Sequence, residues 1–587
     1  MRVAVVPEPG QSGLLCPLHE DGSPAGVPAE TTDLVSAVRE HERKGGVRWV
    51  WPSAASVYQP LLLAGARVAR CHDVALTDAL LRGRDGAAGT AATPGEAGGQ
   101  PAAAGRPAQQ ALFDPVLAGA PGPANPRDTL DALIAVHADQ VRRIAADEHP
   151  GRFGLLVAAE SAGALVAAEM SMAGLPWRRE AHDALLTELL GSRPPLPGQR
   201  PARLAELAAQ VAEAFATTCP HGRRGRQAVN PDSPAQVLAA FAADGIRLPS
   251  TRLAVLRGVD HPAVAPLLEY KELARLHSAF GWTWLDTWVR DGRFRPEYVV
   301  GGVVSGRWAS RGGGALQIPR MLRRAVVADP GCTLVVADAA QLEPRVLAAL
   351  AGDRAFAAAA TAGDLYAELA TAFGGDRAKA KVAMLSAMYG GAGGEAGQLL
   401  AVLRRRFPAA AGYVEAAARA GEEGRVVRSV LGRTCPPPSA SWRALTEEAA
   451  DPDAERDPRA GRASRARGRF TRNFVVQASA ADWALVMLVC LRAGLAKIDM
   501  RNEDSAVPPP PVPPPPVPAP PGAGHRRPEL VFFQHDEVIV HAPREQADAV
   551  VAAVSRAAEQ ASRLVFGPIR IAFPLNTAVV DCYADAK

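Results

Sequence analysis

The chain has 587 residues, which is too long for a single small module and long enough for several domains. Hydrophobic residues make up 48% and charged residues 21%, as in a folded protein rather than a fibrous or disordered one. The net charge is only +4, so the overall balance does not by itself indicate binding to nucleic acid.

The cysteines and the start of the chain indicate the cellular compartment of the protein. Seven cysteines are scattered singly, without the close pairs of a zinc site or the density of a disulfide scaffold. The first residues lack the apolar stretch and the cleavage site of a signal peptide. The most apolar helix candidate, Trp483 to Leu491, is too short to span a bilayer. We therefore expect a soluble cytoplasmic protein without a membrane partner.

The first half of the chain divides into three regions by composition. Residues 1–83 mix short apolar runs with a helical stretch, which predicts a small α/β unit. Residues 85–110 are rich in Ala, Gly, Pro and Thr, hold almost no large apolar residue and predict a disordered linker. Residues 128–280 carry long amphipathic patterns and predict packed helices.

The second half combines strands and helices. The apolar run TLVVAD ends at Asp338, and the runs VFFQ and EVIVHA flank Asp536. Because helical patterns separate these strands, they predict one sheet with a helical insertion. A Pro-rich segment at 507–524 precedes the last two runs and predicts an exposed polyproline II loop.

Two aspartates stand at the ends of these predicted strands. A carboxylate that projects from a sheet edge suits a hard cation such as Mg²⁺. Two such ions about 4 Å apart would activate an attacking oxygen and stabilise a leaving oxygen in phosphoryl transfer. Because Asp338 or Asp536 alone is more often a turn or cap residue, the interpretation depends on the segment between them.

That segment contains a helix with a repeated pattern. Arg377, Lys381, Leu385 and Tyr389 recur every four residues, which places them along one helix face. The two cations suit a triphosphate, and the apolar and aromatic side chains suit a planar base. The structural alternative to a nucleotide site is a helix whose basic first turn faces solvent and whose apolar residues face the core.

Three motifs, in this order, resemble those of the family A DNA polymerases. The stretch Asp338 to Arg345 is similar to motif A of that family, the helix Arg377 to Gly390 to motif B, and His535 to Glu537 to motif C. The stretches SGRWASRGGGALQIPR and RFTRNFVVQASAAD are similar to further parts of the same family. The resemblance covers residues 151–587.

The resemblance implies a mixed α/β (α+β) fold, with the palm, fingers and thumb of a right-hand polymerase. The thumb would span about 151–300 and the palm and fingers about 301–587, after an exonuclease-like domain in residues 1–150. It also implies template-directed addition of deoxynucleotides to a primer 3′ end, in DNA replication or repair. The cofactors would be two Mg²⁺ ions, and the partners primer–template DNA and dNTPs. We expect a monomer associated with the nucleoid.

The resemblance also assigns roles at the catalytic centre. Asp338 and Asp536 would hold the metal ions, with the backbone carbonyl of Ala339 and with Glu537 as further ligands. Glu343 would be the steric gate that favours deoxynucleotides. The incoming nucleotide would be bound by Arg377, Lys381, Gln341, Leu385 and Tyr389, and Lys381 would also act as general acid to the leaving pyrophosphate.

A second set of residues would contact DNA. The resemblance implies that the minor groove and primer terminus are lined by Arg307, Gln317, Arg320, Arg469, Asn473, Gln477 and His535. The run from Arg456 to Arg472 holds seven arginines and favours phosphate contacts. The sequence departs from the family at Ala339, Ala340, Pro344, Leu385 and Gly363 to Tyr366, but none of these changes removes a predicted metal ligand or triphosphate cation.

Residues 1–150 lack the Asp-x-Glu that two-metal exonuclease chemistry uses on its first strand. Asp73 or Asp78 would be remnants of such a site, and His137 stands where the resemblance expects an acid. We therefore expect a degenerate 3′–5′ exonuclease-like domain without proofreading. Two alternatives stay open: a bifunctional polymerase with atypical exonuclease ligands, and a non-catalytic DNA-binding scaffold. Glu343 argues against a single-subunit RNA polymerase.

Overall fold

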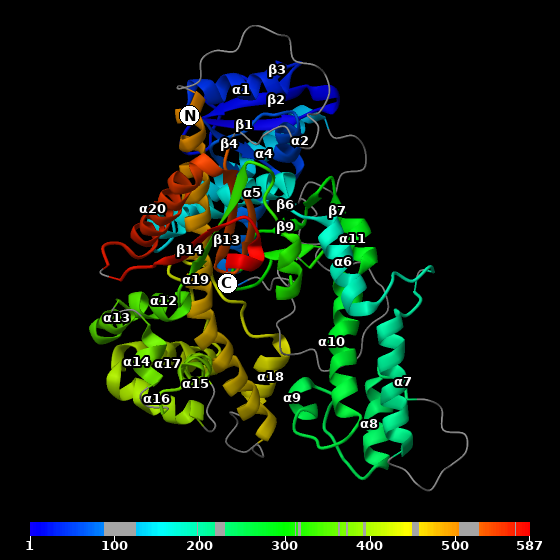
Figure 1. Cartoon of the computed structure of the whole chain (residues 1–587). Coiled ribbons are helices and arrows are strands. Elements are labelled where there is room, and N and C mark those ends of the chain that lie inside the picture. The colour runs from blue at the N-terminus through cyan, green and yellow to red at the C-terminus, as the bar shows by residue number, and fades with distance from the viewer. Residues whose placement is uncertain are drawn as a thin grey trace.

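The computed structural model describes residues 1–86, 125–196, 198–217, 229–311, 313–314, 318–361, 364–370, 374–390, 395–448, 457–503, 527–569 and 571–586. The predicted Pro-rich loop and all but the first two residues of the predicted linker lie outside these ranges. An N-terminal α/β unit and two helical groups surround a central sheet (Figure 1). The mixed fold class expected from the sequence is confirmed.

The N-terminal unit is built on a five-stranded sheet in the order β3-β2-β1-β4-β5. β1 pairs antiparallel with β2, and parallel with β4. Val3 and Val5 pack on α1 and α2, whereas Ala4 and Val6 pack on α4, because side chains alternate along a strand. The elements are β1 (Arg2–Pro7), β2 (Gly13–Leu18), β3 (Ala29–Thr31), α1 (Leu34–Lys44), β4 (Arg48–Trp51), α2 (Ala54–Leu63), β5 (Cys71–Asp73), α3 (Val74–Arg84) and α4 (Pro126–Ala145).

The central sheet has four antiparallel strands in the order β12-β13-β11-β14. Val335 and Ala337 of β11 enter the largest hydrophobic core, and Leu334 and Val336 enter a second core on the other face. The predicted single sheet with a helical insertion is confirmed. The strands are β11 (Cys332–Ala339), β12 (Glu529–Gln534), β13 (Glu537–Pro543) and β14 (Leu575–Val580).

Three long helices pack in the largest core. They are α5 (Pro150–Ala173), α19 (Pro458–Glu503) and α20 (Ala547–Phe566). α20 buries Val550, Val554, Ala557 and Ala561, a spacing of three to four residues that forms one apolar face. α5 also contributes Leu165 to the core of the N-terminal unit, so this helix belongs to both parts.

The sequence expectation about apolar helix length was wrong. Trp483 to Leu491 lies inside α19, which has 46 residues. Within the described residues, α5 and α19 each contain a window long and apolar enough to cross a membrane, but 61% and 83% of these windows are buried inside the protein. Their apolar surface is therefore largely covered by other elements, as in core helices.

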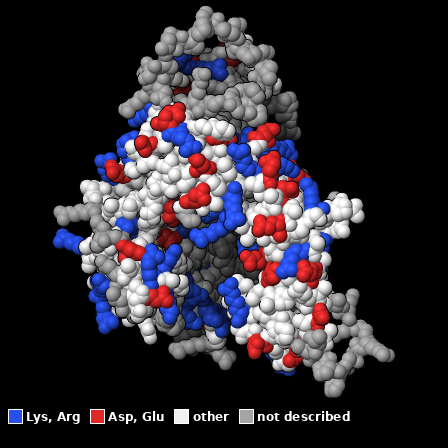
Figure 2. All heavy atoms as spheres, viewed as in Figure 1, with Lys and Arg blue, Asp and Glu red and all other residues white. Residues whose placement is uncertain are grey.

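Two helical groups extend from the central sheet on opposite sides (Figure 1). A space-filling view shows a hollow between them, with Lys and Arg side chains on its rim (Figure 2). The group before β11 contains β6 (Leu175–Pro176), α6 (Arg179–Leu190), α7 (Ala202–Thr217), α8 (Pro234–Ala243), α9 (Leu253–Leu256), α10 (Val264–Phe280), α11 (Trp282–Trp288), β7 (Val289–Arg290), β8 (Arg293–Phe294), β9 (Glu297–Val299) and β10 (Ala309–Arg311). The group after β11 contains α12 (Leu342–Ala351), α13 (Arg354–Thr361), α14 (Leu365–Ala370), α15 (Arg377–Met388), α16 (Glu395–Arg406), α17 (Pro408–Glu422) and α18 (Ala440–Glu448).

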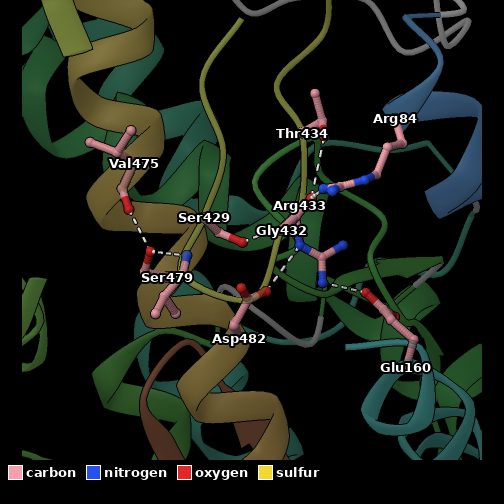
Figure 3. A network of polar contacts seen from close by, with 10 residues as sticks. Arg84, Glu160, Ser429, Gly432, Arg433, Thr434, Val475, Ser479 and Asp482 are labelled. Atoms are coloured by element: carbon pink, nitrogen blue, oxygen red, sulfur yellow. Dashed lines mark hydrogen bonds and ion pairs between the residues drawn. The ribbon is translucent and has the colours of Figure 1, made fainter. Parts of the chain in front are cut away.

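A buried ion triad joins α5 to α19 through the loop that carries Arg433 (Figure 3). Arg433 donates from Nη2 to Oε1 of Glu160 on α5 at 2.5 Å, and from Nε to Oδ1 of Asp482 on α19 at 3.2 Å. All three side chains are less than one-tenth exposed. Next to the triad, Arg84 of α3 donates to the carbonyl of Gly432 at 3.2 Å. One loop therefore binds α3, α5 and α19 together.

The triad carries two carboxylates for one guanidinium. Burial raises the pKa of Glu160 and of Asp482, while Arg433 opposes both shifts. Oε2 of Glu160 and Oδ2 of Asp482 are buried without a hydrogen-bond partner within the described ranges. Both carboxylates therefore depend on Arg433 for charge compensation.

Arg433→Met should strongly destabilise the protein, because it leaves two buried carboxylates without their cation. We expect a loss of about 3–5 kcal/mol, measured as a shift of the urea unfolding midpoint. Arg428→Met is the matched control, since Arg428 lies in the same loop with its side chain 40% exposed. The control should cost less than about 1 kcal/mol. Equal losses for the two variants would contradict a central role of the triad.

A pair of buried histidines lies between β5 and α4. The rings of His72 and His137 meet edge to face with centroids 4.5 Å apart, and Nε2 of His72 lies 2.8 Å from Oε1 of Gln140. Both ring nitrogens of His137 are buried without a hydrogen-bond partner in the described parts of the chain. Burial lowers the pKa of His72 to about 4 and that of His137 to about 3.

These histidines should make the N-terminal unit sensitive to acid. The unfolded chain takes up their protons near pH 6.5 but the folded chain does so only below about pH 4, so stability is complete above pH 6.5 and is lost as the pH falls. Each histidine should cost about 1.4 kcal/mol per pH unit in that window. His137→Leu should remove one such contribution, and the exposed His19→Gln is the surface control. Hydrogen exchange of β1 and α4 between pH 7 and 5 measures this, and identical pH slopes for wild type and His137→Leu would refute it.

Candidate active site

Two strand ends bring the predicted metal ligands together. Asp338, near the end of β11, lies opposite Glu537 of β13 and Asn576 of β14. Asp536 lies in the turn between β12 and β13, and its carbonyl accepts from the Ala339 amide at 3.0 Å. The tight turn places His535 in the left-handed backbone region with a φ of 59°. Asp338 and Asp536 therefore share one end of the sheet, as the sequence predicts.

Glu537 has a different environment from the two aspartates. Its side chain is buried and accepts a hydrogen bond from the Tyr583 hydroxyl. Burial and the neighbouring Glu537 raise the pKa of Tyr583, and the Arg323 guanidinium lies 4.3 Å from the centre of the Tyr583 ring. The structure thus gives Glu537 a partner inside the protein, and its role as a metal ligand stays a prediction.

The donor set at this sheet end suits a hard divalent cation. Asp338 and Asp536 offer carboxylate oxygens, and the backbone of Ala339 lies beside them. Among the described residues, no group of three or more His, Cys, Asp or Glu side chains is placed to hold a metal. Two carboxylates suit an ion that takes its remaining ligands from water and substrate phosphates, as Mg²⁺ does.

Glu343 is the point where three segments of the site meet. Its carboxylate accepts from the Arg307 guanidinium at one oxygen and from the Tyr389 hydroxyl at the other. Its side chain is 15% exposed, and burial raises its pKa although Arg307 acts in the opposite direction. Glu343 therefore ties the end of α15 to the start of α12 and to the loop that carries Arg307.

The predicted basic helix is present as α15. Arg377 is its first residue, Lys381 is exposed one turn later, and Leu385 is half-buried. The Nε of Arg377 donates to Asp364, a residue that the sequence analysis did not single out. Tyr389 follows the last helical residue and turns inward to Glu343. The helix is confirmed, and the nucleotide-binding roles of its residues stay predictions.

The N-terminal half of α19 lies against the end of α15. Gly390 has a φ of +83°, and a Cβ atom there would lie 2.9 Å from Cγ of Arg469, so only glycine allows this approach. One turn along α19, the Oδ1 atom of Asn473 is buried without a hydrogen-bond partner inside the described ranges. Gln477, a further turn along, is half-buried. These residues line up on one side of the helix, at the spacing that the sequence indicates.

The other predicted DNA contacts are His535, Arg307, Arg320 and Gln317. Arg307 binds Glu343 and lies near His535. Burial, and after it the positive charge of Arg307, lowers the pKa of His535. Arg320 is the first residue of the 3₁₀ helix Arg320–Ala325. Gln317 lies outside the described residues.

The arginine run on α19 is not uniformly a DNA-binding surface, which corrects the sequence expectation. Arg467 is buried and donates to the carbonyl of Pro436 at 2.5 Å. Arg472 is also buried and donates to the carbonyl of Met388 at 3.0 Å. Both arginines hold neighbouring backbone, because a buried guanidinium needs acceptors. Four others in the run are exposed: Arg459, Arg462, Arg465 and Arg469.

Known proteins similar to this chain agree on one family. The chain is 36% identical to DNA polymerase I of Chloroflexus aurantiacus over 122 residues, which are 19% of this chain and 12% of that protein. It is 26% identical to the thermostable DNA polymerase I of Thermus aquaticus over 365 residues, 56% of this chain and 37% of the other. The matched regions thus span well under half of the length of these relatives.

The fold has a counterpart among solved structures. It matches the POL domain of Pol1 from M. smegmatis, solved in complex with DNA primer-template and dNTP, with a TM-score of 0.65 and 18% identity, over 100% of this chain and 95% of that one. The family model for DNA polymerase family A matches residues 203–579, a range that contains β11, α15 and the turn of Asp536. Because this match covers nearly two thirds of the chain, the protein belongs to DNA polymerase family A.

Proposed function

We propose that the protein is a template-directed DNA polymerase that adds deoxynucleotides to a primer 3′ end. The observation that carries this proposal is the shared position of Asp338 and Asp536 at one end of the central sheet, together with α15, which exposes Arg377 and Lys381 as predicted. A similar solved structure is described as a complex with primer-template and dNTP, which supports these partners.

Two Mg²⁺ ions held by Asp338 and Asp536 would lower the pKa of the attacking hydroxyl and neutralise the charge of the transferred phosphate. The residues of the chain do the remaining work. Arg377 and Lys381 bind the triphosphate, and Lys381 carries the proton that the leaving pyrophosphate takes up. Positioning and charge neutralisation dominate, because phosphoryl transfer needs little covalent help from the protein.

Glu343 excludes the 2′-hydroxyl of a ribonucleotide. It is fixed at both oxygens by Arg307 and Tyr389, so it cannot move aside at low cost. The wall formed by Arg469, Asn473 and Gln477 contacts the duplex, and the exposed Arg469 offers donors to its phosphates and sugars.

We propose that the N-terminal unit keeps an exonuclease-like fold but does not proofread. The positions of β1 that face α4 are Ala4 and Val6 rather than acids. Asp73 is buried, accepts from the amides of Ala54 at 2.7 Å and Leu76 at 3.0 Å, and thus caps two helices. Burial raises its pKa to about 6. Asp78 pairs with Arg82 on the same helix, so neither remnant is arranged as a metal ligand.

Primer extension tests both proposals. Wild-type protein with Mg²⁺, primer–template and all four dNTPs should extend the primer, and Asp338→Ala and Asp536→Ala should each lose at least about 10³-fold in rate, because the charge of the metal site is lost. Both variants should still bind primer–template with nearly unchanged affinity. Because each variant changes only one residue and leaves the nearby Asp364 and Glu537 unchanged, the loss of extension rate reports on the substituted aspartate.

Each contrary outcome of this assay has a distinct meaning. Binding of DNA without extension by the wild type would favour a non-catalytic scaffold. Shortening of a primer with a mismatched 3′ end, in the absence of dNTPs, would show that the N-terminal unit still acts as an exonuclease. Substantial extension by Asp536→Ala would refute the metal-ligand role of that residue.

Glu343→Ala should ease ribonucleotide entry, because it opens the space that the carboxylate occupies. We expect the ratio of kcat/KM for rNTP over dNTP to rise by at least about tenfold. Glu343→Gln keeps the size of the side chain and is the matched control, with a ratio close to wild type. An unchanged ratio in Glu343→Ala would exclude Glu343 as the gate.

A further inference from the structure

Asp364 lies at the centre of a hydrogen-bonded chain that links the end of β11 to α15. Its Oδ1 accepts from Nε2 of Gln341 at 2.6 Å and from the amide of Tyr366 at 3.0 Å. Its Oδ2 accepts from Nε of Arg377. Both oxygens are therefore used, and the Asp364 side chain is only 33% exposed.

The hydrogen bonds of Asp364 lead back to Gln341, which stands close to the predicted metal ligands. Gln341 has a left-handed backbone with a φ of 54° and stands three residues after Asp338, immediately before α12. Its Oε1 accepts from the amide of Leu365 at 3.2 Å. The Gln341 side chain thus bonds to Asp364 and to the first residue of α14, which sets the distance from the strand end to Asp364.

Arg377 is held from one edge only. Asp364 contacts its Nε, and the guanidinium carbon lies 5.7 Å from the centre of the Tyr366 ring. Its two terminal nitrogens have no hydrogen-bond partner among the described residues, and the side chain is 56% exposed. An arginine fixed at Nε and along its face still presents two terminal amino groups, which is the geometry that binds phosphate oxygens.

Electrostatics agree with a permanent ion pair rather than a neutral contact. Burial acts to raise the pKa of Asp364, but the hydrogen bond and charge of Arg377, together with the hydrogen bonds from Tyr366 and Gln341, lower the pKa overall. The carboxylate therefore stays ionised at neutral pH and keeps hold of the guanidinium. α14 and α15 lie side by side, so the pair joins two neighbouring helices (Figure 1).

We propose that Asp364 is a positioning residue for the incoming nucleotide, which acts through Arg377. It fixes the guanidinium so that its terminal amino groups face the triphosphate, at a distance from Asp338 that Gln341 sets. The advantage is preorganisation, because an unrestrained arginine loses side-chain entropy when it binds. This inference rests on the proposed polymerase function, in which Arg377 binds the triphosphate.

The test compares Asp364→Asn with Asp376→Asn. Asp376 lies one residue before Arg377 and accepts from the Lys379 amide at 3.0 Å at the start of α15. Asparagine still caps a helix, so Asp376→Asn removes one negative charge near Arg377 and leaves the helix start intact. The measurement is the Kd of the correct dNTP for protein bound to primer–template with a dideoxy-terminated primer.

We expect Asp364→Asn to raise this Kd by about tenfold and Asp376→Asn to leave it within about twofold. In steady-state extension, Asp364→Asn should raise the KM for dNTP far more than it lowers kcat. The Kd for primer–template should not change. A variant that merely loosens the fold would instead lose kcat and DNA binding as well.

A double-mutant cycle with Arg377→Ala decides whether Asp364 acts through Arg377. In the Arg377→Ala background, Asp364→Asn should have almost no further effect on the dNTP Kd. Full additivity of the two substitutions, or an unchanged Kd in Asp364→Asn, would overturn the inference. Tighter dNTP binding by Asp364→Asn would also overturn it, because Asp364 would then compete with the triphosphate for Arg377. A wild type that neither binds dNTP nor extends a primer would overturn the proposed function itself.

Discussion

The charge balance around Arg433 is the constraint on which the relative placement of the main elements depends. A guanidinium buried with two carboxylates is stable only when all three groups are in position, because each loses its hydration. The two carboxylates belong to α5 and α19, so the triad fixes these helices against each other. α19 then carries this constraint to the candidate site: Asn473 lies nine residues before Asp482, about 13 Å along the helix axis.

The candidate site combines a rigid frame with a few polar connections. The frame is β11, whose alternate side chains enter two different cores, so a shift of its register by one residue would exchange the two faces. From this strand, Glu343 connects to Tyr389 and Arg307, and Gln341 connects through Asp364 to Arg377. Both ends of α15 are thus held by residues that follow Asp338 within five positions. The position of α15 is therefore set by residues that directly follow the strand carrying Asp338.

Local patterns in the sequence were sufficient for the strands and helices that carry the site. Short apolar runs predict β11 and β13, and the four-residue repeat predicts α15, because each reflects contacts along a single element. The buried arginines could not be predicted in this way. Arg433 meets Glu160 across 273 residues, and Arg472 meets the carbonyl of Met388 across 84. By composition alone, a run of arginines predicts side chains that face solvent or contact phosphates. Only the tertiary fold shows which of them enter the core. The length of α19 was underestimated for a related reason, since Arg and Ala continue a helix beyond its apolar part.

The same reasoning applies to the N-terminal unit, whose sheet is held by apolar contacts on both faces. Its sheet needs apolar side chains on both faces, and Ala4 and Val6 supply them where a metal site would demand buried charge. Its helix α5 is at the same time part of the largest core and carries Glu160 of the triad. Removal of this unit would therefore expose apolar surface of α5 and remove the contact of Arg84 with the Gly432 carbonyl beside the triad. The unit therefore stabilises the part of the chain that contains β11 and α19 through α5, independently of any chemistry of its own.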